Sequence, residues 1–303
     1  MKYSPLLDYL SKKNCKFSQN ELMKNHTTMK VGGPSDVYVE ADNIEVLSYV
    51  IDFSKKNDIP FFLIGNGSNL LVSDEGFRGI ITKLTGEFCN ISKKSDDIIS
   101  CGSGAKLFDI CKFALDNSLS GLEFSYGIPG TCGGAVYMNA GAYGGEIRNI
   151  VEKVKYIDMN LNEGEIFQKE CEFAYRESLF SKKNMIIISA DFRLKESTYD
   201  EVKEKMDDFI NRRITKQPLD FPSSGSTFKR PKGHFVGPMI EKCGLKGFSI
   251  GGASVSEKHA GFVINKGDAS CNDVLELIKK IQKEVEKKFK VKLEVEPVYL
   301  SNK

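Results

Sequence analysis

The sequence of 303 residues has no tryptophan, only three histidines and no long apolar run. The histidines are far apart and no cysteine pair has Cys-x-x-Cys spacing, so no metal site is expected. No apolar segment reaches the roughly 18–20 residues that a membrane helix needs. The first residues also lack the apolar core of a signal peptide. These absences predict a cytoplasmic protein with no membrane association.

A large charge of one sign is also missing. Lys and Arg number 43 and Asp and Glu number 41, which leaves a formal net charge of +2. Nucleic-acid-binding proteins usually carry a basic excess, so no nucleic-acid partner is expected. The eight cysteines are expected to be reduced thiols that pack as small apolar side chains.

Apolar periodicity predicts the main elements of secondary structure. Residues spaced by three or four predict helices over 43–57, 106–117, 199–213 and 273–290. An apolar run predicts a buried strand at 61–64, and strands follow from Val151. Val291, Leu293 and Val295 alternate with charged residues, which predicts a strand there. Helices and strands mixed without regular alternation indicate an α+β fold, with a domain boundary near residue 196.

The first glycine-rich loop is Gly65-Asn66-Gly67-Ser68-Asn69, directly after the predicted strand. Such a loop can offer backbone N–H groups to an anion, and Ser and Asn add side-chain donors. It is neither a dinucleotide fingerprint, because Leu70 replaces the third glycine, nor a P-loop. A plain turn is the alternative interpretation.

The second glycine-rich segment, residues 127–144, is the stronger signal because nearly all of its side chains are very small. A core segment needs side-chain volume to pack, and this one has little. A large or phosphate-bearing ligand, approached closely by the backbone, explains the composition, and structural glycine packing is the alternative.

Together the two loops resemble the FAD-binding half of vanillyl-alcohol-oxidase-type flavoproteins, and further motifs make the likeness closer. In order along the chain, these motifs are Tyr175-Arg176-Glu177-Ser178, Lys216-Gln217-Pro218, Gly225-Ser226-Thr227-Phe228, Lys258-His259-Ala260-Gly261-Phe262 and Leu293-Glu294-Val295-Glu296-Pro297. From about His26 to about Val298 the chain is similar to the UDP-N-acetylenolpyruvoylglucosamine reductase family. Each motif is weak by itself, but the series is specific.

The resemblance implies a fold and an activity. The fold would be a vanillyl-alcohol-oxidase/PCMH-type FAD-binding domain at 23–195. The helical segment expected before it, at 1–22, rests on the spacing of Leu6, Leu7 and Leu10, which predicts a short amphipathic helix. A smaller α+β substrate-binding domain would follow at 196–303. The activity would be that of a flavoprotein reductase, a UDP-N-acetylmuramate dehydrogenase of peptidoglycan synthesis. NADPH would reduce non-covalently bound FAD, which would then reduce the enolpyruvyl ether of UDP-N-acetylglucosamine.

The resemblance also assigns roles to individual residues. Ser226 would donate the proton, while Arg176 and Glu296 would stabilise the enolate that forms on the substrate. Tyr175, Lys216 and Arg230 would contact the substrate. The residues expected to bind FAD are Asn66, Gly67, Ser68, Asn69, Pro129, Gly130, Thr131, Gly133, Gly134, Ala135 and Asn139.

Some features depart from the family pattern. Cys132 stands where an aliphatic residue is usual, and Arg230 stands where the longer form of the family has asparagine. The mobile tyrosine loop of that longer form has no counterpart, so the chain is similar to the shorter form. The sequence does not define the oligomeric state, and a monomer is favoured. Two other functions stay open: an FAD oxidase of the same fold, and a flavin- or nucleotide-binding module without catalysis.

Overall fold

The computed structural model describes residues 2–302, which form two compact units. Unit 1 contains the chain up to Gln19, Val37–Gly65 and Gly79–Asn211. Unit 2 contains Asn20–Asp36, Asn66–Arg78 and the chain from Arg212 onward. The chain therefore passes from one unit to the other several times, and each unit is described by itself.

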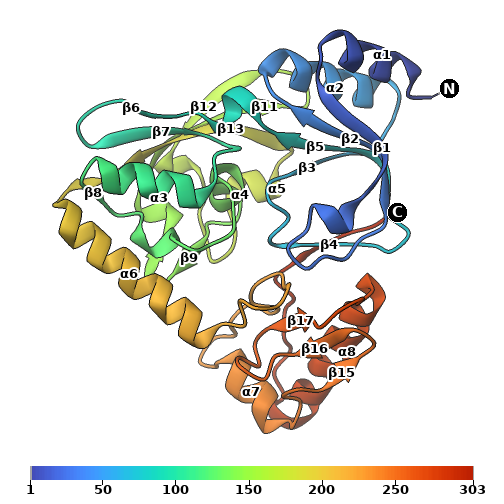
Figure 1. The fold of residues 1–303 in the computed structure, drawn as a ribbon, viewed down its shortest axis with the longest axis vertical. Helices are drawn as coiled ribbons and strands as arrows, with labels where there is room; N and C mark the ends of the chain where they lie inside the picture. Colours follow the sequence, from blue (N-terminus) through green and yellow to red (C-terminus); the bar gives the residue numbers. More distant parts are fainter. Residues whose placement is uncertain (1, 303) are drawn as a thin grey trace. The chain divides into compact units, whose positions relative to one another are not determined.

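The N-terminal part of unit 1 combines a four-stranded sheet with two helices (Figure 1). The sheet order is β1 (Lys16–Leu22), β2 (Pro34–Ala41), β5 (Phe77–Leu84) and β3 (Phe61–Ile64). Helices α1 (Ser4–Lys12) and α2 (Ile44–Lys56) bury their apolar sides, including Leu6, Leu10 and Val50, in one cluster. The side chain of Asn43 caps α2 by accepting a hydrogen bond from Val46 N at 3.0 Å. The predicted helix at 43–57 and strand at 61–64 are thus confirmed.

The rest of unit 1 is built on a five-stranded antiparallel sheet. Its order is β12 (Glu163–Phe167), β11 (Val151–Asp158), β13 (Met185–Arg193), β7 (Ile98–Gly102) and β6 (Ile91–Lys93). Helices α3 (Leu107–Asp116), α4 (Cys132–Tyr137) and α5 (Leu179–Lys182) share an apolar cluster with the sheet. Short pairs join β8 (Leu119–Ser120) to β14 (Lys195–Glu196) and β9 (Gly141–Ala142) to β10 (Gly145–Glu146). Helix α6 (Tyr199–Lys216) places Val202 and Met206 in the same cluster.

Unit 2 contains a small antiparallel sheet covered by a long helix. The sheet order is β15 (Ser249–Ile250), β16 (Ala253–Val255) and β17 (Val263–Asn265). Helices α7 (Val236–Lys242) and α8 (Cys271–Phe289) bury their apolar sides with it. A parallel pair joins β4 (Leu70–Val72) to β18 (Val298–Leu300). Asp74 accepts hydrogen bonds from the first amides of α8, Cys271 N at 2.7 Å and Asn272 N at 2.9 Å.

The predicted strand at Val291, Leu293 and Val295 is wrong. The segment makes a single bridge, between Val295 and Phe228, and the last strand is β18. The alternation is real, since Leu293 is buried and Glu294 is exposed. It arises because one side of this extended segment packs against the apolar core of unit 2. Alternating burial of this kind does not require pairing with another strand.

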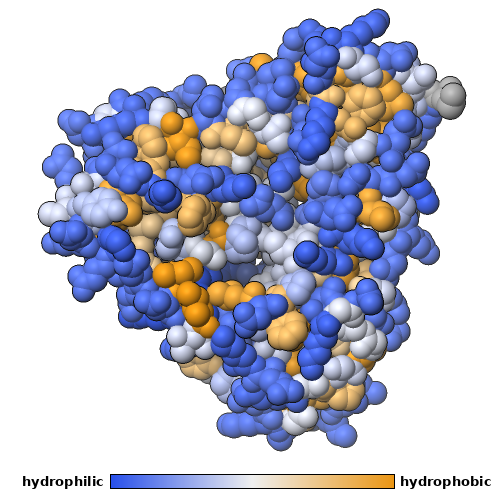
Figure 2. All heavy atoms as spheres, in the orientation of Figure 1, coloured by the Kyte–Doolittle hydropathy of each residue, from blue (hydrophilic) through white to orange (hydrophobic). Residues whose placement is uncertain are grey.

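Figure 2 shows hydrophilic residues over most of the visible face, with smaller apolar areas between them. Within residues 2–302, no helix has both the length and the apolar character needed to cross a membrane. The same residues contain no group of three or more His, Cys, Asp or Glu side chains that could hold a metal ion.

Candidate active site

The loop after β3 leaves its backbone donors open. Across residues 2–302, no acceptor is found for the amides of Asn66, Gly67, Ser68 and Asn69, nor a partner for the side chains of Asn66 and Ser68. Gly67 has a φ of +60°, and a Cβ atom there would lie 2.1 Å from the carbonyl oxygen of His26. Successive open N–H groups in a tight loop form an anion-binding concavity. The donor set therefore fits an anionic group such as a diphosphate.

The second glycine-rich loop uses its amides within the protein. Gly130 N donates to Ile128 O, Cys132 N to Ala105 O and Gly133 N to Ser103 O, each at 2.8 Å. A Cβ on Gly133 would lie 2.8 Å from Cβ of Ser103, so packing alone requires glycine there. Gly134 is exposed, and a Cβ on it would meet only Oγ1 of Thr131, at 3.5 Å. This loop offers an open surface rather than a set of donors.

The two loops adjoin at one position inside unit 1. A Cβ on Gly65 would lie 2.6 Å from Oγ1 of Thr131, and that hydroxyl also accepts a hydrogen bond from Gly134 N at 3.3 Å. Gly65 directly precedes the loop of open amides. The absence of a side chain at Gly65 therefore lets the start of the first loop contact the second loop.

Asn139, predicted to bind FAD, has its side chain occupied by the protein. It is fully buried with a φ of +43°. Its Nδ2 donates to Ala174 O at 2.8 Å and to Oε2 of Glu146 at 3.0 Å, while its Oδ1 accepts from Arg148 N at 3.0 Å. Its side chain therefore fixes the turn that carries Tyr175 and Arg176, and a direct contact with a cofactor would have to break these bonds.

Arg176 lies in a tight turn closed by two hydrogen bonds between Ala174 and Glu177. Its φ of +59° is uncommon for a residue with a side chain and costs on the order of 1–2 kcal/mol. Its Nη2 donates to Gly141 O at 3.1 Å, and its guanidinium lies 5.0 Å from the centre of the exposed Tyr175 ring. Such strain is maintained only where the surroundings enforce it, and it clusters at functional sites.

Unit 2 brings Ser226, Glu296 and the loop of open amides together. Thr227 accepts a hydrogen bond from Glu296 N at 3.0 Å, next to the exposed Ser226. Nδ2 of Asn69 donates to Glu296 O at 3.3 Å, and Val298 N donates to Asn69 O at 2.9 Å. The sequence places these residues far apart, so their proximity is a result of the fold.

The predicted substrate residues of unit 2 are exposed cations. Lys216 ends α6, and Lys258 Nζ donates to Ile214 O at 2.6 Å in the same turn. The Arg230 guanidinium lies 3.9 Å from the centre of the Phe235 ring, and its Nε donates to His234 O at 3.3 Å. The third predicted substrate residue, Tyr175, belongs to unit 1 together with Arg176.

Sequence reasoning missed Thr28. Its amide donates to Gly67 O at 3.2 Å and its hydroxyl to Ser223 O at 2.7 Å, so it contacts both the loop of open amides and the loop of Ser226. The hydroxyl joins residues 195 positions apart in the chain, and no local pattern could have indicated this bond.

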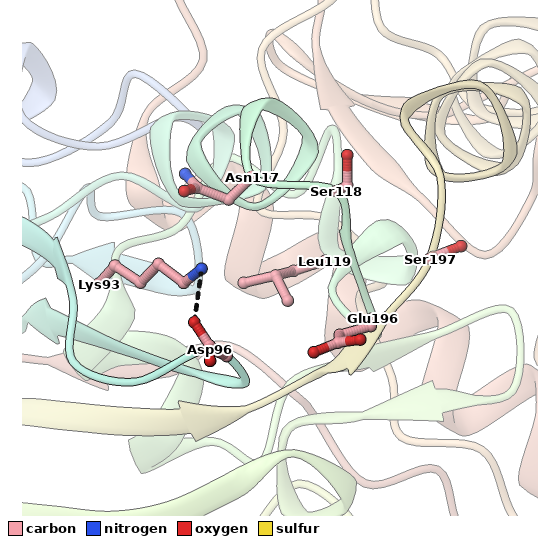
Figure 3. A pocket seen from close by; sticks show the side chains of 7 residues that line it. All are labelled: Lys93, Asp96, Asn117, Ser118, Leu119, Glu196 and Ser197. Carbon is pink, nitrogen blue, oxygen red and sulfur yellow. Dashed lines mark ion pairs between the residues drawn. The ribbon is translucent and has the colours of Figure 1, made fainter.

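A separate hollow of about 250 Å³ lies in unit 1, lined by residues that include Lys93, Asp96 and Glu196 (Figure 3). Lys93 and Asp96, three residues apart where β6 leads into β7, form an ion pair of 3.4 Å at one side of it. None of the predicted site residues lines this hollow.

Comparisons with known proteins decide the family. Residues 35–169 match the model of an FAD-binding domain, and residues 217–300 match that of the C-terminal domain of UDP-N-acetylenolpyruvoylglucosamine reductase. A reductase of that name from Clostridioides difficile is 48% identical over 294 residues, covering 97% of this chain and 96% of the relative. One from Syntrophomonas wolfei is 45% identical and covers 97% of both chains. This chain belongs to the UDP-N-acetylenolpyruvoylglucosamine reductase family.

A solved structure agrees with this result. The crystal structure of UDP-N-acetylenolpyruvylglucosamine reductase from Thermus caldophilus has a TM-score of 0.83 and 32% identity, covering 95% of this chain and 100% of that one. The predicted family and fold class, α+β with a vanillyl-alcohol-oxidase/PCMH-type FAD-binding domain and a C-terminal domain, are confirmed. The predictions of an FAD-binding oxidoreductase and of a place in peptidoglycan synthesis are confirmed at the level of the family.

Proposed function

We propose that this protein uses NADPH and non-covalently bound FAD to reduce the enolpyruvyl ether of UDP-N-acetylglucosamine to UDP-N-acetylmuramate. The observation that carries the proposal is the contact of Asn69 with Glu296, next to Ser226, because it joins the open amides to the proposed catalytic residues. FAD, when bound, supplies the hydride chemistry. The amides of residues 66–69 would hold its diphosphate, and the open face at Gly134 would lie against it.

The chain's own residues would handle charge and protons. Reduction of the vinyl group leaves negative charge on the neighbouring carbon and its carboxylate. The guanidinium of Arg176 would bind that carboxylate with two parallel hydrogen bonds, and Glu296 would add a second stabilising contact. Ser226 would give its hydroxyl proton to the carbon, which is basic enough to accept it from a weak acid.

Substrate binding and the domain limits complete the proposal. Tyr175, Lys216 and Arg230 would contact the UDP-sugar, with the two cations near its diphosphate. We keep 1–22, 23–195 and 196–303 as the domain limits, but the first segment is helical only over α1, since its residues from Lys16 to Leu22 form the strand β1. The two compact units differ from these limits. Helix α6 up to Asn211 packs in unit 1, whereas Asn20–Asp36 and Asn66–Arg78 belong to unit 2. A monomer in the cytoplasm remains our prediction.

The test separates the two half-reactions in an anaerobic stopped-flow instrument. Ser226→Ala should keep FAD bound and should be reduced by NADPH at the normal rate. Oxidation of the reduced enzyme by the enolpyruvyl substrate should fall roughly 10²–10⁴-fold. Ser224→Ala, in the same loop, is the matched control and should react normally. An equal loss of flavin reduction by NADPH in Ser226→Ala would refute the role.

Two further measurements separate this function from the alternatives. An oxidase would stall without oxygen, whereas the proposed enzyme should turn over anaerobically with NADPH and the enolpyruvyl substrate. Arg176→Lys should lose activity although it keeps the positive charge, because one ammonium cannot form the two parallel hydrogen bonds of a guanidinium with a carboxylate. Near-normal turnover in that variant would contradict the assignment of Arg176.

A further inference from the structure

Thr28 connects the two loops that the proposed function depends on, and none of the roles proposed above involves it. Its backbone amide donates to Gly67 O, and its hydroxyl donates to Ser223 O at 2.7 Å. We propose that Thr28 is a positioning residue that sets the spacing between the loop of open amides and the loop of Ser226. This inference rests on the proposed function, since it acts through Ser226.

The Ser226 loop needs such an anchor because it is held mainly at its two ends. At the far end, Thr227 N donates to Gly261 O at 3.0 Å, and the Thr227 hydroxyl accepts from Val263 N at 2.9 Å. At the near end, Ser223 bridges to Ile264 and accepts the bond from Thr28. Between them, Gly225 has a φ of +78° with nothing within 4 Å of its would-be Cβ. Within residues 2–302, neither Gly225 nor Ser226 makes a hydrogen bond.

Loss of the hydrogen bond at one end of this loop would let the loop shift, and the Ser226 hydroxyl would shift with it. A proton donor must lie within hydrogen-bond reach of the atom it serves. A displacement of about 1 Å can cost on the order of a hundredfold in rate. The hydroxyl of Thr28 is thus expected to affect the step that uses Ser226 and no other step.

The neighbouring Thr27 provides a matched control. Its hydroxyl is buried and donates to Val31 O at 2.9 Å, inside its own loop. Thr27→Val and Thr28→Val therefore remove one hydroxyl each at adjacent positions, but only Thr28→Val cuts the link to Ser223. Thr28→Ser keeps the hydroxyl and loses only a methyl group.

The experiment compares these variants as FAD-loaded and FAD-free protein. Thr28→Val should slow oxidation of the reduced enzyme by the enolpyruvyl substrate about ten- to a hundredfold. Its reduction by NADPH should stay within about twofold, and Thr28→Ser should restore the rate. In FAD-free protein, the Thr227 amide, which is hydrogen-bonded to Gly261 O, should exchange its hydrogen faster in Thr28→Val than in Thr27→Val.

Equal rates and equal exchange in Thr27→Val and Thr28→Val would overturn the proposal, as would a normal substrate rate in Thr28→Val. The Ser226→Ala variant, measured alongside, separates the two levels of inference. If Ser226→Ala reacts normally, the proposed function itself fails. If Ser226→Ala is slow while Thr28→Val matches its control, only the role of Thr28 is lost.

Discussion

The two glycine-rich loops differ in what their backbone does. In residues 65–69, the amides from Asn66 to Asn69 have no acceptor within residues 2–302. In the second loop, the amides of Gly130, Cys132 and Gly133 all donate to the protein. The first loop offers four consecutive open amides to an anion, while three amides of the second loop are already used within the protein and its exposed position is Gly134. The number of glycines therefore does not indicate which loop binds charge.

The reasons for glycine differ as well. Gly67 is required because its φ is positive and a backbone oxygen lies where a side chain would be. Gly133 is required by close packing on Ser103, and Gly141 by the backbone oxygen of Gly145, 2.7 Å from a would-be Cβ. Packing explains these two positions without any ligand. The structure thus supports glycine packing, the alternative to ligand binding, at part of the second segment. Gly134 is exposed and has no such packing requirement, so it is the position at which ligand binding can be tested.

The largest effect is expected from Gly67→Ala. The added Cβ would meet His26 O at 2.1 Å and would be held at a positive φ. Folding should lose at least about 2 kcal/mol, from the strained backbone and the clash together. FAD should bind about a hundredfold more weakly, because one or two charge-assisted hydrogen bonds would be misplaced. Fluorescence titration of FAD-free protein, at a temperature where it is folded, measures this loss.

Gly233→Ala is the control for Gly67→Ala. Gly233 also has a positive φ, +76°, but nothing lies within 4 Å of its would-be Cβ. This variant should show the backbone strain alone and bind FAD normally. Equal FAD affinities in the two variants would mean that the open amides do not hold the cofactor.

A pair of substitutions in the second loop should have smaller effects of opposite kinds. Gly133→Ala should lower the free energy of unfolding by about 1–3 kcal/mol, since the core around Ser103 would be overpacked. Gly134→Ala, at an exposed helical position, should leave stability unchanged or raise it by up to about 1 kcal/mol. Thermal unfolding without FAD measures both effects.

FAD titration of the same pair tests the open surface. If the cofactor lies against Gly134, Gly134→Ala should weaken FAD binding although the protein is no less stable. If both variants change FAD affinity only in proportion to their stability, the second loop is a structural element and not a binding surface.

Local patterns in the sequence predicted local features well. The helix at 43–57 and the strand at 61–64 follow from periodicity and a cap, which depend on neighbours in the chain. The strand predicted near Leu293 is wrong because alternating apolar residues indicate that one side of a segment is buried. They do not indicate that the segment pairs with another strand. The use of the Asn139 side chain could not be predicted either, since its partner Ala174 O is 35 residues away. Whether an amide finds an acceptor depends on the whole fold.

The smallest effect concerns Cys132, which lies in the second loop and is completely buried. Burial raises the pKa of its thiol to about 12. At pH 8 only ~1 thiol in 10⁴ would be ionised, and the thiolate is the reactive form. Iodoacetamide should therefore leave Cys132 unlabelled in the folded protein, while the exposed Cys89 reacts. Peptide mass spectrometry measures the labelling at each position.

The same burial predicts how FAD is released. A thiol kept protonated and out of solvent cannot attack the flavin, so acid precipitation should leave all FAD in the supernatant. Cys132→Ala should release it identically and bind it with nearly unchanged affinity, since the thiol contacts Cys101 O at 3.6 Å and faces the interior. Flavin retained in the precipitate of the unmutated protein, but not of Cys132→Ala, would show that this loop supplies a reactive group. The second loop could then no longer be described as an exposed surface without groups that bind or react with the cofactor.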